Sequence, residues 1–241
     1  MLSKRLNAIK NMIPYGTEFV LDIGTDHGLL PIALVKEKEV CKVVGSDIAK
    51  SPVHQAKMNV TRHGLESKID IRQGDGFQVL DKDEQPQVIV IAGMGTETII
   101  DILSRCEACW YNKSNLVLQP MTEPKKLRRF LLEVEYQFSS EKLVKEKSLF
   151  YQIIYSTPKD MNHCQKLTDY QYSELELELG PCIINKRDDV VMEYLDDELN
   201  KTLNVLKSLK NSSSKLGLAK ADEMRYRYHS LLEVRRNVFG S

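Results

Sequence analysis

A glycine-containing turn near the start of the chain holds the residues best suited to binding chemistry. Phe19–Ile23 is a short apolar run that predicts a buried strand, and Gly24 and Gly28 permit a tight turn before the helix that Pro31 opens. In such a unit the backbone approaches a ligand closely, and the helix N-terminus presents unpaired N–H groups. The dinucleotide pattern G-x-G-x-x-G is absent, because the spacing is D-x-G-x-x-x-G. The turn therefore predicts a different nucleotide-like cofactor.

Asp26 stands inside this turn, at a position where a glycine would only make room. The spacing resembles the first motif of class I S-adenosylmethionine (SAM) methyltransferases, usually D/E-x-G-x-G-x-G, in which this position is the middle glycine. SAM carries a sulfonium cation, and a carboxylate beside the methyl-transfer axis would favour a positive charge appearing on the acceptor. The alternative is that Asp26 caps the next helix. His27 is open to three interpretations: a base, a substrate contact or a packed turn residue.

Two further predicted strands end at an acid. Lys42–Asp47 places Asp47 roughly 20 residues after the turn, where nucleotide-binding α/β folds put a carboxylate on the ribose hydroxyls. The alternative is that Asp47 caps the helix after Pro52. Ile69–Gln73 runs into Gly74-Asp75-Gly76. This loop is either a plain turn or a cofactor loop, in which the acid or the residue after it meets the adenine amino group of SAM, as is usual in the superfamily.

The loop after the most strand-like run, Gln87–Ala92, is nearly free of side chains. It reads Gly93-Met94-Gly95, and Thr96 is expected to cap a helix through Arg105. Methyltransferases that act on exocyclic amino nitrogens commonly show Asn-Pro-Pro-aromatic or Asp-Pro-Pro-aromatic here, whose side chain and carbonyl accept the amine protons. The small loop instead fits an acceptor atom that brings its own lone pair, such as a ring nitrogen.

Gln119 and Pro120 end the predicted fifth strand, Asn115–Pro120. Ligands of open parallel sheets bind outside the carboxyl ends of the strands, so these two residues should border the substrate. Gln119 would either hydrogen-bond a base edge or cap the backbone.

Cations gather in three helical segments. Each group would either contact the phosphates of a nucleic acid or form an ordinary charged protein surface. In the last segment the alternative is charge complementarity with the acidic helix before it. The three groups are Lys4, Arg5 and Lys10; Lys125, Lys126, Arg128 and Arg129; and Arg225, Arg227, Arg235 and Arg236.

The order of the predicted elements indicates an α/β fold with a helical appendage. Tyr136–Val144 and Leu149–Ser156 are typical of the antiparallel hairpin that closes a seven-stranded, Rossmann-like class I methyltransferase sheet. Residues 1–157 are therefore expected to form the SAM-binding domain, and 158–241 a C-terminal helical domain that starts with a helix over Thr168–Leu179.

Two heptad seams joined by the polar link Asn211–Ser214 predict an antiparallel coiled-coil hairpin in the tail. The first seam comprises Met192, Leu195, Leu199, Thr202, Leu206 and Leu209, and the second Ala221, Met224, Tyr228, Leu231, Arg235 and Val238.

The bulk composition excludes several classes of protein. The 241 residues include 34 basic and 34 acidic side chains, so no global field draws the chain to nucleic acid or membrane, and contacts with nucleic acid require local patches. No apolar run is long enough for a membrane span or a signal peptide, which predicts a cytoplasmic protein. The five scattered cysteines predict reduced thiols. Cys106 and Cys109 lack nearby further ligands, the closest being His163-Cys164, so no metal is expected.

Taken together, these residues resemble the bacterial tRNA (adenine-22-N1)-methyltransferase family, over roughly residues 2–155. The segments that carry the resemblance are Leu2–Leu6, Asp22–Pro31, Gly74–Gly76, Ile91–Gly95, Leu118–Pro120 and Tyr151-x-Ile153. The family joins a Rossmann-like SAM domain to a C-terminal coiled coil. Two residues depart from its pattern: Thr96 stands where a second glycine is usual, and Leu29 where an aromatic residue is usual. Both affect how the base would pack more than the reaction itself.

The resemblance implies a role for each motif. Adenine N1, freed from base pairing, would attack the SAM methyl group, and S-adenosyl-L-homocysteine would leave. The implied catalytic residues are Asp26, Gln119 and Pro120; the cofactor-binding residues are Asp22, Gly24, Thr25, His27, Asp47, Ile48, Gly74, Asp75, Gly76, Gly93 and Met94; and the substrate-binding residues are Lys4, Arg5, Lys125, Arg128 and Arg129. The partner would be tRNA, and the protein a monomer or weak homo-oligomer. The alternatives are a SAM- or nucleotide-binding scaffold or sensor, and a methyltransferase of a small molecule or protein.

Overall fold

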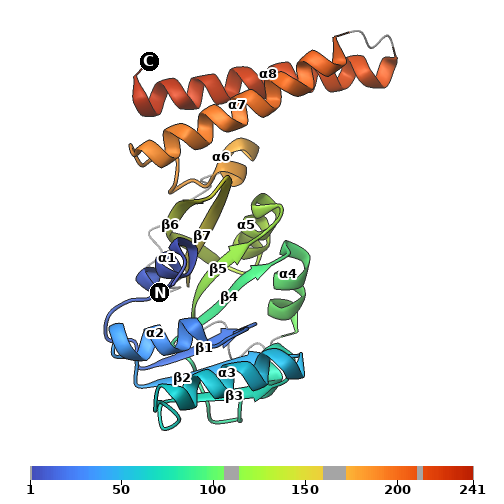
Figure 1. Cartoon of the computed structure of the whole chain (residues 1–241). Coiled ribbons are helices and arrows are strands. Elements are labelled where there is room, and N and C mark those ends of the chain that lie inside the picture. The colour runs from blue at the N-terminus through green and yellow to red at the C-terminus, as the bar shows by residue number, and fades with distance from the viewer. Residues whose placement is uncertain (1, 106–113, 160–171, 211–213, 241) are drawn as a thin grey trace. The chain divides into compact units, whose positions relative to one another are not determined.

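The computed structural model describes residues 2–105, 114–159, 172–210 and 214–240 (Figure 1). The chain divides into two compact units, residues 1–167 and 168–241, and the last strand of the first unit runs through Pro158. Cys106, Cys109 and the expected start of the tail at Thr168 lie outside the described residues. Within the described part of the chain, no helix combines the length and apolarity needed to cross a membrane.

The first unit contains one seven-stranded sheet in the order β3-β2-β1-β4-β5-β7-β6. β1 to β5 pair in parallel, and β7 runs antiparallel to both β5 and β6, which confirms the predicted methyltransferase sheet. The strands are β1 (Phe19–Ile23), β2 (Lys42–Asp47), β3 (Ile69–Gln73), β4 (Val88–Met94), β5 (Asn115–Pro120), β6 (Tyr136–Glu146) and β7 (Leu149–Pro158).

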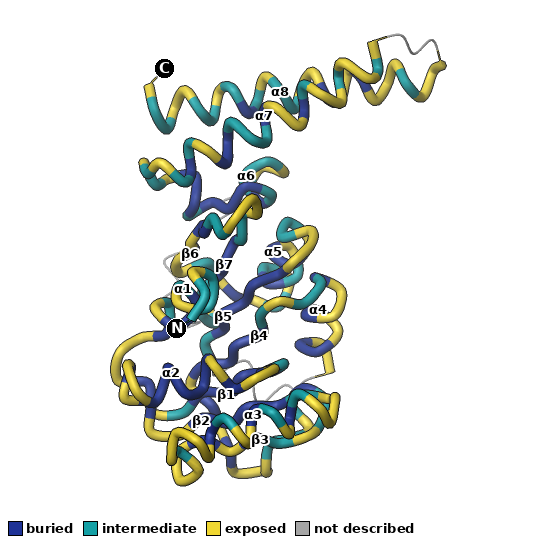
Figure 2. Tube along the Cα trace, viewed as in Figure 1, coloured by how far each residue is buried: buried dark blue, intermediate teal, exposed yellow. Residues whose placement is uncertain are grey.

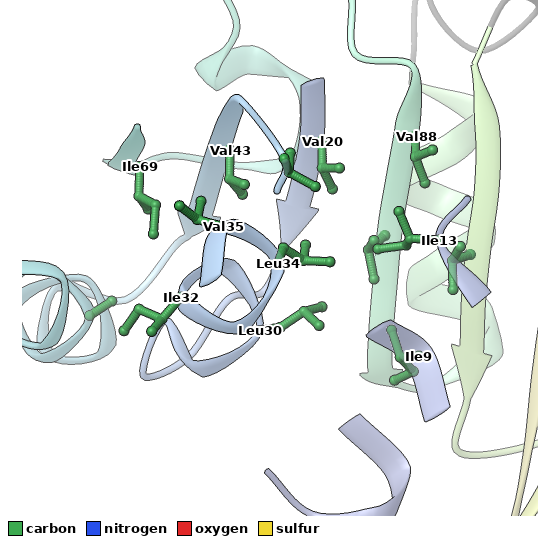
Figure 3. Close-up of a cluster of buried hydrophobic side chains, with 14 of the residues drawn as sticks. Ile9, Ile13, Val20, Leu30, Ile32, Leu34, Val35, Val43, Ile69 and Val88 are labelled. Atoms are coloured by element: carbon green, nitrogen blue, oxygen red, sulfur yellow. The ribbon is translucent and has the colours of Figure 1, made fainter. Parts of the chain in front are cut away.

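Helices cover both faces of this sheet because neighbouring strand residues point to opposite sides. Val20 of β1 packs with α1 to α3, whereas the adjacent Leu21 packs with α4 and α5. Figure 2 shows the buried residues concentrated along the strands, and Figure 3 shows side chains of α1 and α2 directed toward Val20 and Val88. The helices of this unit are α1 (Lys4–Met12), α2 (Leu29–Glu37), α3 (Lys50–Arg62), the 3₁₀ turn η1 (Gly76–Val79), α4 (Thr96–Ser104) and α5 (Pro124–Glu133).

The second unit consists of α6 (Glu174–Leu179), α7 (Asp189–Leu209) and α8 (Lys215–Phe239). α7 and α8 pack against each other as the predicted hairpin, with Leu195 and Leu231 fully buried. Arg227 of α8 pairs with Glu198 of α7 at 2.8 Å and with Glu178 at 2.6 Å, and Arg235 pairs with Asp196 at 2.7 Å. Arg227 and Arg235 therefore complement the acidic helix, which is the alternative considered for the cations of this segment.

One predicted helix start is wrong because another residue takes the capping position. Gly95, not Thr96, is the N-cap of α4, and the Thr96 hydroxyl instead donates to the carbonyl of Thr122. In the tail, α6 begins at Glu174, where Ser173 and Glu176 form a capping box that fixes the start of this helix.

Glu84 fastens the connector before β4 to the strands β2 and β3. Its buried carboxylate accepts hydrogen bonds from Arg72 Nη1 at 2.5 Å, from Lys42 Nζ at 2.6 Å and from the Asp81 N–H at 2.9 Å. Burial alone would raise the pKa of Glu84, but the hydrogen bonds from Arg72, Lys42 and Asp81 outweigh it and lower the pKa to about 2. The carboxylate is therefore held in its charged form by the folded state.

This arrangement predicts an acid-sensitive contribution to stability. The unfolded pKa is about 4.3, so the stabilisation is complete above that pH and is lost as the pH falls toward 2. Glu84→Gln should lower the unfolding free energy by about 1 to 3 kcal/mol at pH 7, and the difference from wild type should shrink by pH 3. Urea titrations at both pH values measure this. Glu66→Gln, at an exposed glutamate, is the control, and an equal deficit of the Glu84 variant at both pH values would contradict the expectation.

Candidate active site

The carboxyl ends of the parallel strands bring the predicted motifs to one edge of the sheet. The turn after β1 is held against β2, because the N–H groups of Gly24 and Thr25 both donate to the carbonyl of Ser46, at 2.8 and 2.9 Å. Gly24, Asp26 and Gly28 all have a left-handed backbone, with φ of 77°, 52° and 70°. Asp26 thus keeps the conformation that a glycine would adopt most easily, and an aspartate tolerates it better than most residues do.

Side chains at the two glycines of the turn would meet neighbouring atoms. A Cβ on Gly24 would lie 2.2 Å from the methyl carbon of Met94, and one on Gly28 would lie 3.3 Å from the Cβ of Ala56. The hydroxyl oxygens of Thr25 in the turn and of Ser46 in β2 are buried without a hydrogen-bond partner. A turn that contains glycines and has buried polar atoms beside it fits the close approach of a nucleotide-like cofactor.

Asp22 is the buried acid of the motif. Burial raises the pKa of its carboxyl to about 6, although the neighbouring Thr25 acts in the opposite direction. At neutral pH this carboxylate is therefore charged but poorly solvated, which makes it a favourable neighbour for a cation.

Asp26 and His27 face outward from the turn. Their side chains are 68% and 52% exposed, and His27 Nε2 lies 3.5 Å from Asp26 Oδ1. The N-cap of α2 is Gly28, and no side chain caps that helix, so Asp26 does not serve as its cap. The carbonyl of His27 accepts a hydrogen bond from Asn59 Nδ2 of α3 at 2.9 Å. The carboxylate is thus displayed at the strand edge on a turn that is anchored from both sides.

The ends of β2 and β3 carry the other predicted cofactor residues. Asp47 Oδ1 accepts from the N–H of Ala49 at 2.9 Å, and α3 starts at Lys50 without a side-chain cap, so Asp47 does not cap a helix. Ile48 beside it is 68% exposed, so its apolar side chain is accessible to a ligand. The loop Gly74–Gly76 is tied to β2 by a bond from the Gly74 N–H to the carbonyl of Asp47 at 3.0 Å.

Asp75 has a partner that the sequence analysis missed. Arg105 at the end of α4 donates to both of its carboxylate oxygens, at 2.5 and 3.2 Å, and these hydrogen bonds lower the pKa of Asp75. The pair has no local sequence motif, because the packing of α4 against the sheet is what brings Asp75 and Arg105 together. An adenine amino group at Asp75 would share the carboxylate with this arginine.

Gln119 is placed at the expected edge but is turned inward. Its side chain is fully buried; Oε1 accepts from Arg5 Nη1, and Nε2 donates to the carbonyl of Pro120, both at 2.7 Å. The second alternative considered for Gln119, a contact with the backbone, is the one present here.

Arg128 was predicted to contact the substrate from the protein surface, and this prediction is wrong. Arg128 is 0% exposed, and its guanidinium is bound to Glu141 of β6 and Gln152 of β7, because α5 turns this residue onto the sheet together with Leu127 and Leu131. Lys10 is likewise buried and pairs with Glu37. Lys4 and Arg129 are exposed, Lys125 is half-buried, and Arg5 lies among the strand ends.

The sheet order, the glycine turn after β1 and the acids that follow β2 and β3 define a Rossmann-like, SAM-dependent methyltransferase. The family described as tRNA (adenine(22)-N(1))-methyltransferase, TrmK, matches residues 20–227. The chain belongs to this family.

Named relatives agree with this assignment. The chain is 29% identical to the tRNA (adenine(22)-N(1))-methyltransferase of Bacillus subtilis over 97% of its length and 96% of the relative's. The B. subtilis crystal structure of TrmK superimposes with a TM-score of 0.82 at 28% identity, covering 98% of this chain and 99% of that one. The M. capricolum TrmK structure, solved with S-adenosyl-homocysteine, gives a TM-score of 0.80 at 26% identity and covers 99% of both chains.

Proposed function

We propose that this protein transfers the methyl group of SAM to N1 of adenine 22 in tRNA. The observation that carries the proposal is the exposed Asp26 carboxylate, on the glycine-containing turn after β1, at the edge where β4 ends in Gly93-Met94 and is followed by Gly95. Membership in the tRNA (adenine(22)-N(1))-methyltransferase family supports both the reaction and the position.

The residues of this edge would each bind a different part of SAM. Asp47 would hold the ribose hydroxyls, and the exposed side chain of Ile48 would cover one face of the adenine of SAM, with Asp75 near its amino group. Asp22 would lie near the positive charge of the methionine part. Gly24 and Gly93 leave the backbone free to approach. When bound, SAM supplies an electrophilic methyl group.

The acceptor base is activated by its surroundings more than by proton removal. N1 carries its own lone pair, so no base is required, but it is available only when the adenine is unpaired or turned out of its stack, at a cost of a few kcal/mol. Methylation leaves the ring positively charged. Asp26 would stabilise that charge as it develops.

The raised pKa of Asp22 predicts that SAM binding weakens in mild acid. A bound cation favours the carboxylate form, so below pH 6 binding must displace a proton, and affinity should fall by up to about tenfold per pH unit. Calorimetric titration with S-adenosylhomocysteine between pH 5 and 8 measures this, since that product keeps the α-ammonium group. Asp22→Asn should bind more weakly at pH 8 and lose most of the pH dependence. The same slope in the variant as in wild type would show that another group is responsible.

The proposed substrate is tested with radiolabelled SAM and tRNA transcripts. A transcript with adenine at position 22 should be methylated, and the same transcript with guanine there should not. Methylation of both transcripts would place the target elsewhere. No transfer to RNA would favour the SAM-binding scaffold or a protein or small-molecule substrate.

We further propose that the protein acts in the cytoplasm as a monomer or weak homo-oligomer, and that its cofactor domain and helical tail are separate domains with a boundary near residue 158. Because the formal net charge is zero, an RNA contact would be made by local patches of positive charge and not by a global field.

A further inference from the structure

One arginine of the first helix reaches the ends of three strands. Arg5 Nη1 donates to Gln119 Oε1 of β5 at 2.7 Å, and the same nitrogen lies 3.3 Å from the place where a Cβ on Gly93 of β4 would stand. The guanidinium carbon also lies 5.7 Å from the ring centroid of Tyr151 in β7, within the range of a cation–π contact.

The contact at β4 coincides with an irregularity in the sheet. Ala92 pairs with Gln119 and Met94 pairs with Pro120, so Gly93 is an extra residue between two successive pairs, with φ of 77°. Bulges of this kind bend a strand and re-aim its end. A side chain on Gly93 would crowd the guanidinium, so glycine at the bulge and arginine in α1 fit each other.

The contact at β5 leaves the Gln119 side chain no freedom. The amide is fully buried, with its oxygen on Arg5 and its nitrogen on the carbonyl of Pro120. Without Arg5, the amide oxygen would be buried without a donor, which typically costs about 1 to 3 kcal/mol and would drive the amide to rotate. The hydrogen-bonding pattern of the acceptor edge therefore depends on the arginine.

Helix α1 is held firmly enough to deliver this side chain. Ile9 and Ile13 are fully buried in the core, and the hydroxyl of Ser3 caps the helix by accepting from the N–H of Leu6. The N–H of Lys4 donates to Glu146 in β6 at 3.1 Å. Arg5 is thus placed from a rigid element.

We propose that Arg5 is a positioning residue of the methyl-acceptor site, which sets the bulge at Gly93 and the amide of Gln119 in the geometry that the target adenine meets. The inference rests on the proposed function and refines it. It replaces the expectation that Arg5 contacts a phosphate. The role of Arg5 is instead to help orient the acceptor base. A misplacement of about 1 Å at such a site lowers rates by about 10²-fold.

The test is a double-mutant cycle on Arg5→Met and Gln119→Leu, with Arg5→Lys and Asn7→Ala as further variants. Each of the first two should lower kcat about 10- to 100-fold, change KM for tRNA less than about threefold, and leave the dissociation constant of S-adenosylhomocysteine within twofold. The double variant should be no slower than the slower single variant, because both changes break one unit. Arg5→Lys should rescue little, since lysine lacks the planar fork, and Asn7→Ala, on the exposed side of α1, should behave as wild type.

A readout without turnover keeps the test independent of the substrate. The side-chain NH₂ protons of Gln119 should exchange slowly with solvent in wild type by NMR and at least tenfold faster in Arg5→Met. Normal kcat in Arg5→Met, a loss confined to KM for tRNA, multiplicative losses in the double variant, or unchanged exchange would each overturn the proposal. A wild-type protein that methylates no tRNA would refute the proposed function instead, and the exchange rates would still decide whether Arg5 holds Gln119.

Discussion

Replacing Asp26 with asparagine is expected to lower kcat for tRNA methylation by about 10²- to 10³-fold. The carboxylate is exposed at the strand edge, does not cap α2 and makes no close hydrogen bond to another described side chain, so its charge is available to a ligand. Asparagine keeps the size and tolerates the left-handed backbone of this position, with φ of 52°. The variant therefore removes the charge and little else.

Two controls separate chemistry from folding in this experiment. Asp26→Gly restores the residue usual in related motifs and relaxes the backbone, so it should be at least as stable as wild type and as slow as the asparagine variant. Both variants should bind S-adenosylhomocysteine within about twofold of wild type. Single-turnover kinetics measure the methyl-transfer step directly, and a wild-type rate in either variant would remove Asp26 from the mechanism.

Replacing Arg128 with alanine is expected to destabilise the protein by about 3 to 5 kcal/mol. Arg128 and Glu141 are both completely buried, with Arg128 Nη2 2.6 Å from Glu141 Oε1 and its Nε at 2.7 Å. Loss of the arginine leaves a buried carboxylate without its counter-charge. Urea unfolding measured by circular dichroism gives the free energy.

A variant in which Glu141 is also replaced provides a sharper comparison of stability. Arg128→Met combined with Glu141→Leu removes both charges and should recover most of the loss, since apolar residues often replace a buried pair at little cost. Lys126→Ala in the same helix breaks the exposed pair with Glu97 and should destabilise the protein far less than Arg128→Ala does. A loss of similar size for Lys126 and Arg128 would show that the burial of Arg128 does not matter.

The sheet was predictable because its signals are local. Apolar runs such as Phe19–Ile23 and Val88–Ile91 mark buried strands, and the polar or glycine residues after them mark the edge at which ligands bind. The heptad seams of α7 and α8 are also local patterns, which is why the hairpin was predictable from periodicity.

Most of the wrong or missing predictions concern contacts between distant segments. In the sequence Arg128 is one cation of a basic helix, whereas in the structure α5 places it against β6. Arg105 meets Asp75 only through tertiary packing. Arg5 and Gln119 are 114 positions apart, so neither the bond nor the buried state of the amide has a sequence signature. Spacing identifies the strand ends, whereas the network that orients them requires the structure.

The most direct test of the central claim is mass spectrometry of nucleosides from tRNA treated with the protein and SAM, digested under conditions that preserve base-labile modifications. The account predicts 1-methyladenosine, formed in amounts that match the S-adenosylhomocysteine released, and absent when adenine 22 is replaced. Formation of N6-methyladenosine or a methylated guanosine, or release of S-adenosylhomocysteine without a modified nucleoside, would contradict it.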